Sequence, residues 1–110
     1  MNLESKFVWM NGALVPHAQA TVPFLTPALH YGTAVFEGMR AYPTPRGPAI
    51  FRLKDHIARL FASASIFGFT DLPWTQEEVI AGSKAVVREN GFTSCYVRPL
   101  IFAASGHMSL

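Results

Sequence analysis

The chain has 110 residues, a length that fits one domain, and 50% of its residues are hydrophobic while 15% are charged. Its formal net charge is +2, and the nine lysines and arginines are scattered along the chain, which argues against a nucleic-acid partner. No apolar run approaches the roughly 18 residues that a membrane-spanning helix needs, so no membrane partner is expected.

The cysteine content and the N-terminus bear on the cellular compartment. Cys95 is the single cysteine, which excludes an internal disulfide and is usual in a reducing compartment. The first residues lack the basic start and apolar core of a signal peptide. We therefore expect a soluble, cytoplasmic protein. Because so small a domain has much surface for its volume, we also expect part of its apolar surface to meet another domain or subunit.

The chain is predicted to begin with a hairpin. Phe7–Met10 and Ala13–Val15 flank Asn11-Gly12, a pair that readily adopts the positive φ of a tight turn. The stretch Pro16–Pro27 contains prolines without any sustained period, so we expect an irregular loop that crosses the molecule.

A strand is predicted over Ala34–Tyr42, where side chains alternate between two faces. One face carries Phe36, Gly38 and Arg40, together with Ala34. The other face carries Val35, Glu37, Met39 and Ala41. A large ring, an absent side chain and a guanidinium on one face suit the wall of a small-molecule site. An ordinary half-buried strand is the alternative.

A turn and a helix are predicted next. The prolines of Pro43–Pro48 remove backbone donors, so this stretch is expected to be a turn, with Ala49–Phe51 as the returning strand. Apolar residues then recur at helical spacing, which predicts a helix that begins at Leu53 and ends before Gly68.

The second half of the chain completes the predicted fold. Thr75 and Glu78 have the spacing of a capping box, which predicts a helix that ends at Asn90-Gly91. Ser94–Ala104 is predicted to be a strand, and Pro99 places it near a sheet edge or bulge. Strands at both ends with helices between them predict an α+β fold, an antiparallel sheet with two helices packed on it.

Two groups of polar residues are candidates for chemistry. Arg59 lies at the edge of the first helix's apolar stripe, either as a solvated cation or as a bidentate clamp for a phosphate or carboxylate. Tyr96 and Arg98 point the same way from the last strand, where they could bind a carboxylate. Alternatively, Arg98 pairs with an acid such as Glu37 for structural reasons. Tyr31 is either a core aromatic residue or a pocket lid.

Other chemistries lack their characteristic residues. The four histidines show no metal-ligand spacing, and with a single cysteine no zinc site, and no metal of any kind, is expected. The chain also lacks a glycine-rich phosphate loop, a serine nucleophile elbow and the dinucleotide-binding glycine motif. Cys95 lies in an apolar strand and is expected to be a buried, inert thiol.

Separated blocks of the chain resemble the N-terminal part of the class IV (fold type IV) aminotransferases, and most closely the branched-chain amino acid aminotransferases. The blocks are His30–Tyr42, Arg52–Leu60 and Tyr96–Leu100, and Trp9–Gly12 resembles the family's first hairpin. The core Val-Phe-Glu-Gly-Met-Arg favours this branch over D-amino-acid aminotransferases and aminodeoxychorismate lyases. Those relatives typically carry a Gly-Asp-Gly form where this chain has Gly32-Thr33-Ala34.

The resemblance implies an activity and roles for individual residues. It implies a homo-oligomeric transaminase that uses pyridoxal 5′-phosphate to exchange an amino group between leucine, isoleucine or valine and 2-oxoglutarate. It implies that Arg59 binds the cofactor's phosphate. Its implied substrate contacts are Phe36 and Gly38 along the side chain, Gly38 leaving room for branched carbons, Tyr96 at the substrate carboxylate, Arg98 at glutamate's distal carboxylate, and Tyr31 from the neighbouring subunit. His107 and Met108 fall in a loop that approaches the partner's pocket.

The resemblance also implies that catalytic parts lie outside these 110 residues. None of Lys6, Lys54 and Lys84 matches the lysine that binds the cofactor covalently in this family. We therefore expect residues 1–110 to be the small N-terminal domain, without the large cofactor-binding domain, and not to transaminate alone. A free-standing, non-catalytic interaction domain is the alternative of another class.

Overall fold

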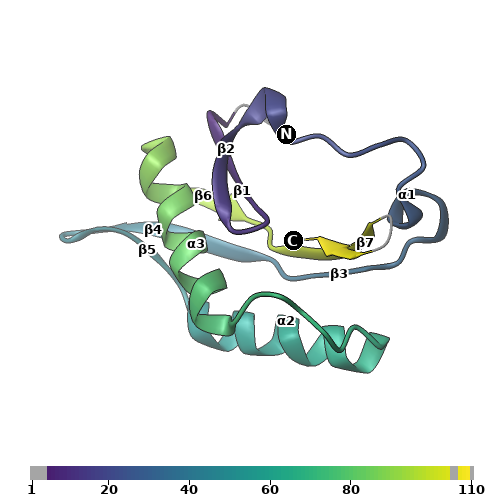
Figure 1. Ribbon diagram of the computed structural model, residues 1–110. Coiled ribbons are helices and arrows are strands. Elements are labelled where there is room, and N and C mark those ends of the chain that lie inside the picture. Colours follow the sequence, from purple (N-terminus) through teal and green to yellow (C-terminus); the bar gives the residue numbers. More distant parts are fainter. Residues whose placement is uncertain (1–4, 105–106, 110) are drawn as a thin grey trace.

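The computed structural model describes residues 5–104 and 107–109, and in this part of the chain two long helices pack on three small antiparallel sheets (Figure 1). The predicted α+β class is confirmed, but the strands are divided among several sheets where a single sheet was expected. Within the same residues, no helix is both long and apolar enough to cross a membrane.

The N-terminal hairpin is confirmed. Strands β1 (Phe7–Met10) and β2 (Ala13–Pro16) pair antiparallel around Asn11 and Gly12, whose φ angles are 52° and 90°. Positive φ at both central residues matches the right-handed twist of the strands, which is why Asn-Gly suits this turn. The hairpin lies against helix α3 (Gln76–Asn90), as Figure 1 shows.

Both long predicted strands are interrupted, so the prediction of continuous strands was wrong. Ala34–Tyr42 divides into β3 (Ala34–Phe36) and β4 (Met39–Thr44), and Ser94–Ala104 divides into β6 (Cys95–Val97) and β7 (Leu100–Ala104). β3 pairs with β7 and β4 pairs with β6, so the two interruptions lie side by side. Pro99 has no N–H to continue the ladder, and its carbonyl accepts the Glu37 N–H at 3.1 Å.

The predicted turn at Pro43–Pro48 is shorter than expected. β4 continues to Thr44, β5 (Gly47–Ile50) begins at Gly47, and Pro45 and Arg46 alone form the loop. Pro43 lies opposite Pro48 in this hairpin. Antiparallel pairs alternate between hydrogen-bonded and non-bonded positions, so two prolines facing each other remove no ladder bond.

The expected irregular loop contains two helical turns that the sequence reading missed. Residues His17–Gln19 form a short 3₁₀ helix, η1, and Pro27–Tyr31 form helix α1, which ends at Gly32 with φ 65°. Proline is favoured in the first turn of a helix and glycine just after the last, and both stand here. Strand β8 (His107–Ser109) pairs with β7 beyond the last predicted strand.

Both long helices are confirmed with their ends. α2 (Leu53–Phe67) is followed by Gly68, whose φ of 97° is easy only for glycine. At the start of α3, the Glu78 N–H donates to Thr75 Oγ1 and the Thr75 N–H donates to Glu78 Oε1, each at 3.1 Å. This reciprocal pair is the predicted capping box.

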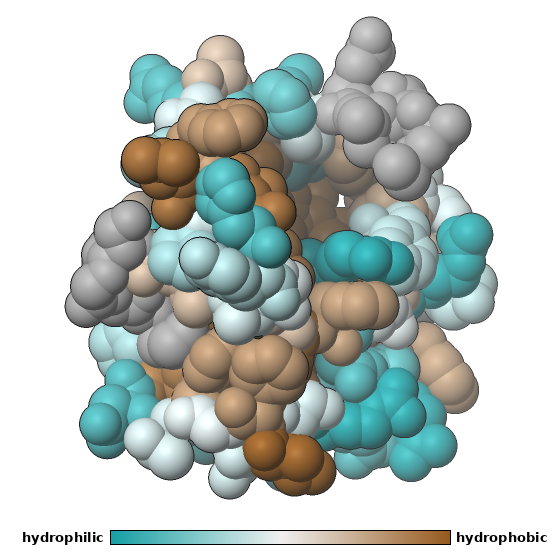
Figure 2. All heavy atoms as spheres, turned by 90° about the vertical axis from the view of Figure 1, so that its right-hand side faces the viewer, coloured by the Kyte–Doolittle hydropathy of each residue, from teal (hydrophilic) through white to brown (hydrophobic). Residues whose placement is uncertain are grey.

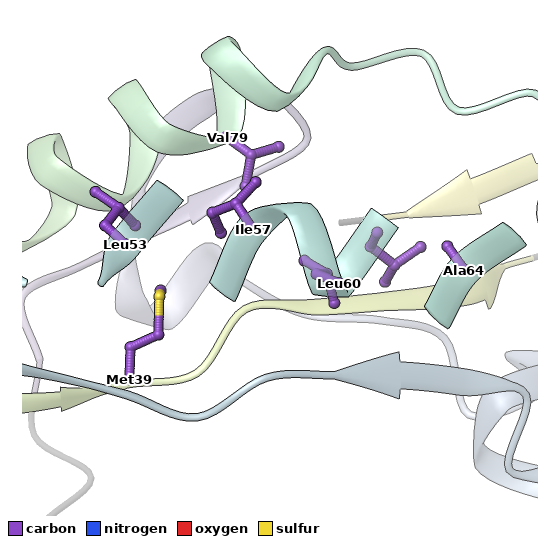
Figure 3. Close-up of a cluster of buried hydrophobic side chains, with 7 residues drawn as sticks. Met39, Leu53, Ile57, Leu60, Ala64 and Val79 are labelled. Atoms are coloured by element: carbon purple, nitrogen blue, oxygen red, sulfur yellow. The ribbon is translucent and has the colours of Figure 1, made fainter. Parts of the chain in front are cut away.

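The core lies between α2, α3 and one face of the strands. Figure 3 shows its buried side chains converging from α2, α3 and β4: Met39, Leu53, Ile57, Leu60, Ala64 and Val79. The alternation predicted along residues 34–42 is confirmed, because Glu37, Met39 and Ala41 are buried while Phe36, Gly38 and Arg40 are exposed. The face that carries the candidate substrate residues is therefore the one that the helices leave open.

Candidate functional site

The open face brings Phe36, Tyr96 and Arg98 into contact. The Arg98 guanidinium lies over the Phe36 ring, 4.4 Å from its centroid, and 5.4 Å from the centroid of the Tyr96 ring. Arg98 Nη2 also donates a hydrogen bond to Tyr96 Oη at 2.8 Å. Two aromatic rings and a hydroxyl thus hold the cation at the surface, where its other N–H groups can meet an anion.

Gly38 lies directly beneath the Tyr96 ring. A Cβ at residue 38 would collide with Tyr96 Oη and would lie 3.2 Å and 3.3 Å from ring atoms Cζ and Cε2. The φ of Gly38 is outside the left-handed region, so its backbone would accept other residues. Glycine is therefore required at residue 38 for space and not for backbone conformation.

A second polar cluster forms behind this face, around Glu37. Arg59 Nε donates to Glu37 Oε2 and Arg59 Nη2 to Oε1, both at 2.8 Å, and His56 Nδ1 donates to Oε1 at 2.8 Å. The Glu37 side chain is only 7% exposed. A buried carboxylate needs such partners, because an unpaired buried charge is strongly unfavourable.

The cluster favours the ionised form of Glu37. The hydrogen bonds from Arg59 lower the pKa of the Glu37 carboxyl below its ordinary value of 4.5; burial opposes this effect and His56 reinforces it. The same contact raises the pKa of Arg59. Glu37 is therefore a fixed negative charge that orients the Arg59 guanidinium.

The structure resolves the two alternatives for Arg59 in part. The side chain makes a bidentate contact with a carboxylate, but that carboxylate belongs to Glu37 of the same chain. It is nevertheless 68% exposed, and within the described residues its Nη1 has no hydrogen-bond partner. One edge of the guanidinium is anchored and the other is open to an external anion.

Glu37 also excludes one alternative for Arg98. The pairing of Arg98 with Glu37 is wrong, because Glu37 points toward α2 while Arg98 lies on the open face. Strand alternation separates the two side chains, and Arg59 and His56 already occupy the carboxylate.

Tyr31 is placed apart from these residues. It ends helix α1, is 80% exposed, and its ring centroid lies 6.3 Å from that of His30. Helix α1 lies at the opposite end of the molecule from the β4–β5 hairpin (Figure 1). Within one chain Tyr31 therefore does not join the Phe36 face. The side chains of His107 and Met108 lie outside the described residues.

Sequence reasoning missed Glu37 and His56 as members of a cluster. Two signals were available: an acidic residue at a core-facing strand position requires a partner, and His56 and Arg59 are three residues apart on one helix face. Cys95 is half-buried in β6, and burial raises the pKa of its thiol, in line with the expected inert role.

An apolar cavity extends from the open face toward the hairpin. Its volume is about 620 Å³, and Tyr96 and Arg98 contribute to its lining together with apolar residues of β1, α3 and β7. Figure 2, which looks at the α1 end, shows apolar side chains at the surface between polar ones. An aliphatic group and an anion could both be accommodated here.

Comparisons with known proteins identify relatives of this chain. Over 103 residues it is 48% identical to a branched-chain-amino-acid aminotransferase of Pseudomonas aeruginosa, covering 94% of this chain and 33% of that protein. It is 40% identical over 109 residues to the enzyme of the same name from Escherichia coli strain K12, covering 97% of this chain and 34% of that protein. The chain thus spans about a third of the length of these curated relatives.

Solved structures give the same result. A branched-chain amino acid aminotransferase whose source is abbreviated T.th. superposes with a TM-score of 0.90 at 47% identity, over 96% of this chain and 36% of that one. The same T.th. protein has been solved with N-(5′-phosphopyridoxyl)-L-glutamate, with pyridoxamine 5′-phosphate and with 4-methylvaleric acid. The model of the family "Amino-transferase class IV" matches residues 34–109, which is more than half of the chain. The chain therefore belongs to the class IV aminotransferase family.

Proposed function

We propose that this chain is the small N-terminal domain of a branched-chain amino acid aminotransferase. The whole enzyme would exchange an amino group between leucine, isoleucine or valine and 2-oxoglutarate with pyridoxal 5′-phosphate as cofactor. The observation that carries the proposal is the stacking of the Arg98 guanidinium on Phe36 at 4.4 Å, next to an apolar cavity. The names of the relatives support it.

The two half-reactions need one site for an aliphatic and an anionic side chain. Phe36 offers an apolar surface to branched carbons, while Arg98 and Tyr96 offer a cation and a hydroxyl to a distal or α-carboxylate. Holding the cation flat against a ring keeps it away from the aliphatic chain and so avoids burying an unpaired charge beside it. The T.th. protein, solved with a glutamate adduct and with an aliphatic acid, supports this dual use.

Arg59 fits the phosphate of the cofactor. Glu37, which His56 also contacts, anchors one edge of the Arg59 guanidinium, and the open Nη1 edge can donate to phosphate oxygens. When bound, pyridoxal phosphate supplies an electron sink for reaction at the substrate's α-carbon. Lys6, Lys54 and Lys84 are not in the family's position for the lysine that holds this cofactor, so we expect residues 1–110 alone not to transaminate.

The proposed enzyme is a cytoplasmic homo-oligomer. Tyr31 projects from the α1 end of the molecule and is largely exposed, as expected for a residue that completes the site of a neighbouring subunit. The exposed apolar side chains Phe24, Leu25 and Leu29 surround it in sequence and would be covered by such a contact.

A substrate comparison on the whole enzyme tests the proposal. We expect the purified protein to transfer the amino group of L-leucine to 2-oxoglutarate and to leave D-alanine unchanged, measured by chromatography of the amino acids formed. The isolated 110-residue chain serves as the inactive control. Turnover of D-alanine in preference to L-leucine would contradict the branched-chain assignment and favour a D-amino-acid aminotransferase.

A further inference from the structure

The space above Gly38 is already filled within this chain. Tyr96 Oη lies where a Cβ of residue 38 would be, and the Cζ and Cε2 atoms of the same ring are within 3.3 Å of that position. Tyr96 pairs with Arg40 in the β4–β6 ladder, so its ring reaches diagonally across the strands to residue 38. The absent side chain therefore accommodates the tyrosine hydroxyl before it accommodates any substrate.

The same hydroxyl positions the cation. Arg98 Nη2 donates to Tyr96 Oη at 2.8 Å, and the guanidinium rests on the Phe36 ring at 4.4 Å. Arg98 is otherwise exposed, and a long exposed side chain has many rotamers of similar energy. Removing or shifting the hydroxyl would leave the Phe36 ring as the main constraint on the guanidinium.

We infer that Gly38 is a positioning residue for the carboxylate-binding pair Tyr96 and Arg98, and that it thereby favours dicarboxylate substrates. This inference rests on the function proposed above and assigns Gly38 a role other than providing room for branched carbons. A methyl group at residue 38 would displace the Tyr96 ring, break or lengthen its hydrogen bond with Arg98, and release the cation from Phe36.

The two roles of Gly38 make opposite predictions. If residue 38 only leaves room for a branched side chain, Gly38→Ala impairs L-leucine more than L-glutamate, and its effect is independent of Tyr96. If residue 38 seats the Tyr96 hydroxyl, Gly38→Ala impairs L-glutamate more than L-leucine, because glutamate alone needs Arg98 at its distal carboxylate. In addition, the effect must depend on the presence of that hydroxyl.

A double-mutant cycle separates the roles. Gly38→Ala, Tyr96→Phe and the double variant are made in the whole enzyme, and kcat/KM is measured with L-leucine and with L-glutamate as amino donors. We expect Gly38→Ala to lower kcat/KM for L-glutamate by about tenfold more than for L-leucine, the size of one lost charge-assisted contact. Arg98→Gln gives the reference loss for glutamate.

The Tyr96→Phe background is the matched control for the added methyl group. Phenylalanine lacks the oxygen that collides, so we expect Gly38→Ala to change kcat/KM by no more than about twofold when Tyr96 is already Phe. Effects of the two substitutions that multiply, or a Gly38→Ala variant impaired mainly with L-leucine, would overturn the inference.

Thermal unfolding of the same variants tests the contact without reference to activity. We expect Gly38→Ala to lower the Tm and the added Tyr96→Phe to restore part of the loss. Equal Tm losses in both backgrounds, or failure of both alanine variants to fold, would show that the hydroxyl does not occupy the space, whatever the enzyme catalyses. Absence of leucine turnover in the unmodified enzyme would contradict the proposed function, and the Tm cycle would still decide the contact.

Discussion

At the scale of single residues, Glu37 links the two faces of the strand. It stands between Phe36 and Gly38 in the chain, yet its side chain turns toward α2 and anchors Arg59 and His56. The interruption between β3 and β4 places this carboxylate where the helix can reach it. One short segment therefore contributes to the open aromatic face and to the anchored guanidinium behind it.

The Glu37 cluster predicts a pH dependence of stability. Its carboxyl pKa is below 4.5 in the folded protein, so below pH 4.5 the unfolded chain binds more protons than the folded chain. The stabilisation is fully present above pH 4.5 and is lost as the pH falls through the lowered folded pKa. We expect Glu37→Gln to reduce the free energy of unfolding at pH 7 by about 1–3 kcal/mol, measured by denaturant titration.

The control for this experiment is Glu89→Gln, because Glu89 is exposed and its contact with Arg88 is long, at 3.5 Å. We expect the difference between wild type and Glu37→Gln to shrink below pH 4.5, while the Glu89 variant follows wild type throughout. A difference that stays constant down to strongly acidic pH would show that Glu37 is not ionised in the fold.

At the scale of elements, helix α3 fixes the N-terminal hairpin. Asn90 Oδ1 accepts the N–H groups of Lys6 at 2.7 Å and Phe7 at 3.1 Å, and its Nδ2 donates to the carbonyls of Phe7 and Val86. Nearby, the indole of Trp9 packs so closely on Gly82 that a Cβ there would collide with it. One amide side chain thus ends the helix and begins the strand.

Replacing this amide is expected to loosen β1. Asn90→Ala leaves the N–H groups of Lys6 and Phe7 without their acceptor, which we expect to lower the free energy of unfolding by about 1–3 kcal/mol. Hydrogen exchange should show faster exchange at these two amides than at amides within α2. Arg88→Ala, exposed on the same helical turn, is the control, and equal effects of both variants would contradict a specific role for Asn90.

At the scale of the whole molecule, the chain leaves large apolar side chains uncovered. Phe24 is 80% exposed and Leu25 is 74% exposed, and both precede α1 at the end of the molecule seen in Figure 2. The Phe24 carbonyl and ring both contact His30, so this segment is held in place and not merely extended. Ordered apolar residues at the surface are typical of a contact region.

This surface predicts association of the isolated chain. We expect residues 1–110 to form dimers or larger species in analytical ultracentrifugation and to bind a hydrophobic fluorescent dye. The double variant Phe24→Ser and Leu25→Ser should reduce both signals. Ile66→Ser, which removes a single apolar side chain at the end of α2, is the control and should change them less. A wild-type chain that stays monomeric and binds no dye would contradict this prediction.

The sequence alone determined the features that depend on neighbouring residues. The Asn-Gly hairpin, the helix ended by Gly68 and the capping box of Thr75 and Glu78 were predicted correctly, because each is specified within a few positions. The division of residues 34–42 into two faces followed likewise from the period of a strand. The Pro27 and Gly32 signals of α1 were also local, but a helix this short has no apolar period to reveal it.

Only the tertiary structure decided which residues meet across the fold. Arg59 reaches Glu37 over 22 positions of sequence, and Tyr96 fills the space at Gly38 from another strand. The interruption of both long strands depended on their mutual alignment at Pro99, which neither strand encodes by itself. Local backbone preferences act within a helical turn or a tight loop, whereas partner choice depends on how the sheets and helices pack together.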